Sequence, residues 1–85
     1  MTTEIRKILN HYGIEHQKSK SIEELSELIR AISRNDSKNI MEEIADVEIM
    51  IEQLKLIYWL TPEEIQDIKK QKIEKALFEI RSVNP

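Results

Sequence analysis

The apolar positions of this chain recur every three or four residues in four successive segments, a pattern that indicates amphipathic helices. We predict helices at about 3–11, 15–34, 37–59 and 62–81. The second of these carries an apolar stripe formed by Ile22, Leu25, Leu28, Ile29 and Ile32. The pattern therefore predicts a single all-α domain over residues 1–85, with a short first helix and three long ones.

Local signals mark the breaks between these helices. Gly13, the only glycine, stands where the end of the first helix needs a left-handed residue. The segment 35–37 is typical of a turn followed by a helix N-cap. Thr61, Pro62 and Glu64 fit an N-cap, a first helical position and a capping box. Because the connections are short, we expect the second and third helices, and the third and fourth, to be antiparallel neighbours.

The third helix has two apolar strips on almost opposite sides. The main strip is Ile40, Val47, Met50, Leu54 and Ile57, and the second is Ala45, Ile49 and Leu56. A helix that is apolar on two sides is buried on two sides, which favours a subunit interface. A chain of 85 residues also has a thin core, so self-association is the simplest way to cover leftover apolar faces.

Composition excludes several classes of protein. Charged residues make up 34% of the chain, but the net charge is −3, which argues against a non-specific nucleic-acid binder. There is no cysteine, so disulfides and thiolate metal sites are excluded. No apolar run is long enough for a membrane span, and the N-terminus lacks a signal-peptide pattern. We therefore expect a cytoplasmic protein without membrane or nucleic-acid partners.

Two pairs of carboxylates are placed symmetrically about the predicted turn. Glu24 and Glu27 lie three residues apart on the second helix, as do Glu43 and Asp46 on the third. Residues three apart share a helix face. The midpoint of the two pairs is Asn35, so each pair lies roughly 14 Å from the tip of the hairpin at 1.5 Å per residue. An antiparallel hairpin would bring four carboxylates to the same height.

A divalent cation is the natural compensation for carboxylates that face one another beside an apolar stripe. Oxygen ligands suit Mg²⁺, with Mn²⁺ as the alternative, and such an ion recruits substrate phosphates and activates water. The competing interpretation is that each pair belongs to an ordinary solvated face, since Glu-x-x-Glu pairs are common in acidic helices. A di-metal redox bundle is disfavoured because His11 and His16 form no Glu-x-x-His pattern. A P-loop is excluded because there is no glycine-rich phosphate loop.

The segments 23–28 and 42–47, read Glu-Glu-Leu-Ser-Glu-Leu and Glu-Glu-Ile-Ala-Asp-Val, resemble the signature of the MazG-like all-α nucleoside triphosphate pyrophosphatases. The resemblance covers about residues 12–60 and includes Gln17. It implies cleavage of a (d)NTP by water to a (d)NMP and pyrophosphate, in the service of nucleotide-pool cleansing. It also implies dimers or tetramers, and magnesium held by Glu24, Glu27, Glu43 and Asp46.

Candidate substrate-binding residues are Gln17, Lys20, Lys72 and Lys75. Lys20 lies one turn before Glu24 and either meets a phosphate or pairs with that carboxylate. Lys72 and Lys75 fall where relatives carry Lys and Arg, although a solvated face explains them equally well. The alternative to an enzyme is a non-catalytic oligomeric helical module, interacting or regulatory, that keeps the acidic pairs.

Overall fold

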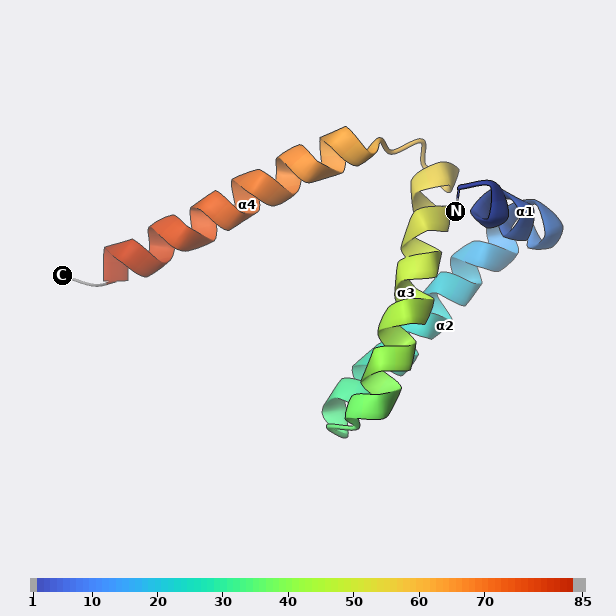
Figure 1. Ribbon diagram of the computed structural model, residues 1–85, viewed down its shortest axis with the longest axis horizontal. Coiled ribbons are helices and arrows are strands. Elements are labelled where there is room, and N and C mark those ends of the chain that lie inside the picture. Colours follow the sequence, from blue (N-terminus) through green and yellow to red (C-terminus); the bar gives the residue numbers. More distant parts are fainter. Residues whose placement is uncertain (1, 84–85) are drawn as a thin grey trace.

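The computed structural model describes residues 2–83, which form four helices and no strand (Figure 1). The helices are α1 (Thr2–Tyr12), α2 (Ile14–Ser33), α3 (Ser37–Ile57) and α4 (Pro62–Val83). The predicted all-α fold is confirmed, and every predicted helix boundary lies within two residues of the observed one. Among the described residues, no helix combines the length and apolar character needed to cross a bilayer.

The predicted breaks are confirmed at the level of the backbone. Gly13 has φ 90° and ψ 160°, a conformation that side chains with a Cβ avoid, and its N–H donates to the Leu9 carbonyl at 2.8 Å. The Asp36 carboxylate accepts the Asn39 N–H at 3.3 Å and so caps α3. The Thr61 hydroxyl accepts the Glu64 N–H at 3.1 Å at the start of α4.

Helices α2 and α3 form the predicted antiparallel hairpin, and α1 packs against both (Figure 1). The buried apolar side chains are few: Ile5, Ala31, Val47 and Met50. The hairpin brings Glu24 and Glu27 on α2 to the same height as Glu43 on α3.

Polar side chains occupy the part of the α2–α3 interface that lies next to α1. Gln53 is completely buried, and its Oε1 accepts a hydrogen bond from Gln17 Nε2 at 2.7 Å. The buried Ser21 hydroxyl donates to the Gln17 carbonyl at 2.8 Å and lies 3.4 Å from Met50 Sδ. A hydrogen bond between buried amides has a narrow geometry, so this pair fixes the register of α2 against α3.

The expectation that α3 and α4 are antiparallel neighbours is wrong within one chain. No part of α4 packs against α1, α2 or α3, and Figure 1 shows α4 leading away from the hairpin. The turn between α3 and α4 contains Trp59, which has a positive φ of 56° and is 91% exposed. The left-handed residue and the Thr61–Pro62 helix start direct the chain outward, where its apolar residues meet no other helix of the same chain.

Candidate metal centre

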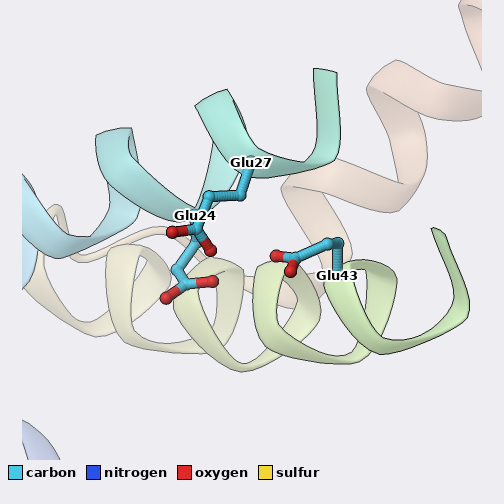
Figure 2. A group of neighbouring side chains, drawn as sticks. All are labelled: Glu24, Glu27 and Glu43. Carbon is cyan, nitrogen blue, oxygen red and sulfur yellow. The ribbon is translucent and has the colours of Figure 1, made fainter. Parts of the chain in front are cut away.

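Three carboxylates converge on one point of the hairpin. Glu24 and Glu27 extend from α2 toward Glu43 on α3, as Figure 2 shows. One carboxylate oxygen of each lies within 4.8 Å of the others. We call Glu24, Glu27 and Glu43 the acidic cluster. Like charges this close repel strongly unless something positive lies between them.

The acidic cluster is partly shielded from solvent. Glu24 is only 8% exposed, and Glu27 and Glu43 are partly buried. Glu24 Oε2 and Glu43 Oε2 are buried without a hydrogen-bond partner. An unpaired buried carboxylate oxygen costs free energy, and a divalent cation would remove that cost for several oxygens at once. The donor set, all hard oxygens, fits Mg²⁺ or Mn²⁺.

Asp46, the fourth predicted ligand, lies outside the acidic cluster. It is exposed on the next turn of α3, near enough for its charge to act on Glu43. The structure therefore gathers three of the four predicted ligands and leaves Asp46 at the open edge of the cluster.

The four predicted substrate-binding residues have different surroundings. Gln17 is buried in the interface, bonded to Gln53 and 2.7 Å from His16 Nδ1, so its amide is occupied. Lys20 Nζ lies 3.4 Å from Glu24 Oε1 and 3.7 Å from Glu23, and the hydrogen bond to Glu24 raises its pKa. Lys72 and Lys75 lie on α4, and both are exposed. Within one chain, α4 does not bring them to the acidic cluster.

The environment of Glu43 changes its titration. Partial burial raises the pKa of Glu43 above its ordinary 4.5. The charges of Glu27, Glu24 and Asp46 raise it further. The folded protein therefore holds this proton more tightly than the unfolded chain, and the stability of the metal-free protein falls as pH rises through the window above 4.5.

We predict that Glu43→Gln raises the melting temperature of the metal-free protein at pH 8 and weakens the fall of that temperature as the pH rises above 4.5. The reason is that the neutral amide replaces a negative charge that the carboxylates of Glu24 and Glu27 repel. Thermal unfolding followed by circular dichroism in EDTA measures the effect. Glu42→Gln is the matched control, because Glu42 is exposed and outside the acidic cluster. Equal melting curves for Glu43→Gln and the wild type would contradict the prediction.

Comparison with known proteins agrees with this arrangement. A family model described as the MazG nucleotide pyrophosphohydrolase domain matches residues 13–75. The match spans α2 and α3 with the whole acidic cluster, and more than half of α4. No curated protein and no solved structure matches the chain.

Proposed function

The chain belongs to the MazG nucleotide pyrophosphohydrolase family, and we propose on that basis that it hydrolyses nucleoside triphosphates between the α- and β-phosphates. Water adds to one phosphorus, the bridging P–O bond breaks, and the products are a nucleoside monophosphate and pyrophosphate. The observation that carries the proposal is the acidic cluster with two unpartnered buried oxygens, within the region that the family model matches.

The residues that would hold Mg²⁺, or Mn²⁺ in its place, are Glu24, Glu27, Glu43 and Asp46. A bound divalent ion would neutralise phosphate charge and make a coordinated water more acidic. Glu24 and Glu27, on the same face of α2, would hold the ion together with Glu43 across the hairpin. Asp46, which is exposed at the open edge of the acidic cluster, would accept the proton of the attacking water or complete the ligand set.

We place this activity in the cytoplasm, in a homo-oligomer that cleanses the nucleotide pool. The lack of cysteine supports a reducing compartment. Large exposed apolar side chains on α2, α3 and α4 support self-association, because a monomer rarely leaves so many uncovered.

The proposal is tested by pyrophosphate release from a panel of canonical and modified (d)NTPs, with Mg²⁺ and with EDTA. We expect release from at least one nucleotide, with monophosphate in equal amount, and its loss in EDTA. Equal amounts distinguish cleavage at the α-phosphorus from stepwise loss of phosphate. If folded, Mg²⁺-loaded protein released no pyrophosphate from any nucleotide of the panel, the proposal would be overturned and a non-catalytic helical module would be favoured.

A further inference from the structure

One cation lies directly against the acidic cluster. Lys20, one turn before Glu24 on α2, has its Nζ 3.4 Å from Glu24 Oε1 and 3.7 Å from Glu23 Oε1. Within residues 2–83, no other lysine, arginine or histidine forms an ion pair with a carboxylate of the acidic cluster. A single ammonium offsets only part of the repulsion among three neighbouring carboxylates.

The two carboxylate oxygens of Glu24 have different surroundings. Oε1 is paired with the ammonium of Lys20, whereas Oε2 is buried without a partner. The side chain of Glu24 is 10% exposed, and that of Lys20 is 42% exposed. The pair therefore joins a nearly buried carboxylate to a partly exposed ammonium, and it leaves Oε2 available to an ion.

The charge of Lys20 is permanent in neutral solution. The hydrogen bond to Glu24 raises the pKa of the ammonium above its ordinary 10.5, and the charges of Glu23, Glu24 and Glu27 raise it further. A divalent ion that enters the acidic cluster therefore meets two forces at once. The carboxylates attract it, and the fixed ammonium beside Glu24 repels it.

Lys20 has two opposite effects on an ion in the acidic cluster. By holding the carboxylate of Glu24 it favours binding, because a partner that orients a ligand improves metal affinity. By its own charge it opposes binding, and this repulsion is doubled by the double charge of the ion. Burial already restricts the side chain of Glu24, so the partly exposed ammonium adds little to its orientation. The effect of the charge is therefore the larger of the two.

We infer that Lys20 is the resident counter-charge of the acidic cluster, which stabilises the metal-free carboxylates and lowers their affinity for a divalent ion. The inference rests on the metal centre of the proposed function, but it does not depend on turnover. Both effects come from the same charge, so stability that the ammonium adds to the metal-free protein is lost from the binding of the ion. For the proposed function, the ion is held less tightly than the carboxylates alone would hold it.

Calorimetric titration with Mn²⁺, near neutral pH and in low salt, tests the effect on the ion. Lys20→Met keeps most of the apolar stem of the side chain and removes its charge. We expect the affinity for Mn²⁺ to rise about 3- to 10-fold, the scale of a solvent-screened charge acting on a divalent ion. Lys20→Arg keeps the charge and is expected to bind Mn²⁺ like the wild type. Lys7→Met, which removes an exposed charge on α1, is the control for net charge.

The dependence on salt separates the charge of Lys20 from its role in packing. At about 1 M KCl, where the screening length is about 3 Å, the gain in affinity of Lys20→Met is expected to shrink toward zero. A gain that persists in high salt would overturn the inference, as would an unchanged affinity in low salt. An affinity that falls in Lys20→Met would show that orienting Glu24 outweighs the charge, and it would overturn the inference as well.

Thermal unfolding in EDTA tests the effect on the metal-free protein. Lys20→Met is expected to lower the melting temperature by roughly 2–5 °C in low salt. In a Glu24→Gln chain the same substitution is expected to have a clearly smaller effect, because its main ion pair is already lost. An equal loss in both chains would overturn the inference, as would a wild type that binds no Mn²⁺. A wild type that binds Mn²⁺ but releases no pyrophosphate would count against the proposed function alone.

Discussion

Glu43→Gln is expected to lower Mg²⁺-dependent pyrophosphate release by about 100- to 1,000-fold. The amide keeps the size of the side chain but removes the charge that α3 contributes to the acidic cluster. A bound divalent ion supplies several kcal/mol of transition-state stabilisation, and each ~1.4 kcal/mol is a factor of ten in rate. Steady-state rates at saturating Mg²⁺ measure the loss, and calorimetric titration with Mn²⁺ measures the accompanying loss of metal affinity.

Glu42→Gln controls for the change of net charge, and its rate is expected to stay near that of the wild type. Circular dichroism checks that both variants keep their helices. A Glu43→Gln rate within about threefold of the wild type, less than ~0.7 kcal/mol of transition-state stabilisation, would remove Glu43 from the metal centre.

Gln53→Met is expected to destabilise the protein by about 1–3 kcal/mol, the cost of an unpaired buried polar group. Methionine is close to glutamine in length and fills the same space, but it leaves Gln17 Nε2 without its acceptor. For a domain of this size each kcal/mol lowers the melting temperature by about 4–8 °C. Thermal and urea unfolding, followed by circular dichroism, measure the difference.

The double variant Gln17→Met/Gln53→Met separates the hydrogen bond from the packing. Because it removes donor and acceptor together, most of the lost stability is expected to return. Gln71→Met, on the exposed face of α4, is expected to have little effect. If the double variant loses the sum of the two single losses, the amide pair is not coupled and does not fix the register of the hairpin.

The helices and their ends could be predicted from the sequence because their causes are local. Gly13 needs a backbone conformation that other residues avoid, and the caps at Asp36 and Thr61 depend on residues three positions away. The convergence of the acidic cluster was predictable for a related reason. The mirrored spacing about Asn35 fixes the heights of the carboxylates once the hairpin forms.

Other features depend on contacts that sequence spacing does not encode. Asp46 follows Glu43 by three residues and shares its side of α3, but it lies outside the acidic cluster. Gln53 was missed as a core residue. Its signal was a polar residue on the inner face of α3, three positions beyond Met50, but only the structure shows that Gln17 is its partner.

The position of α4 could not be predicted from the sequence. Its apolar pattern indicates that one face of the helix packs against another surface, but it does not identify that surface. Short connections favour neighbouring helices in the same chain. Here the left-handed Trp59 and the helix start at Pro62 direct α4 away instead.

Trp59 has a further consequence for how this protein can be studied. It is the only tryptophan in the chain, and it is 91% exposed at the turn from which α4 departs. Indole emission depends on the polarity around the ring, so the tryptophan fluorescence of the unmodified protein reports on this one turn. Trp59 is therefore an intrinsic fluorescent probe in the turn between α3 and α4, and no label has to be introduced there.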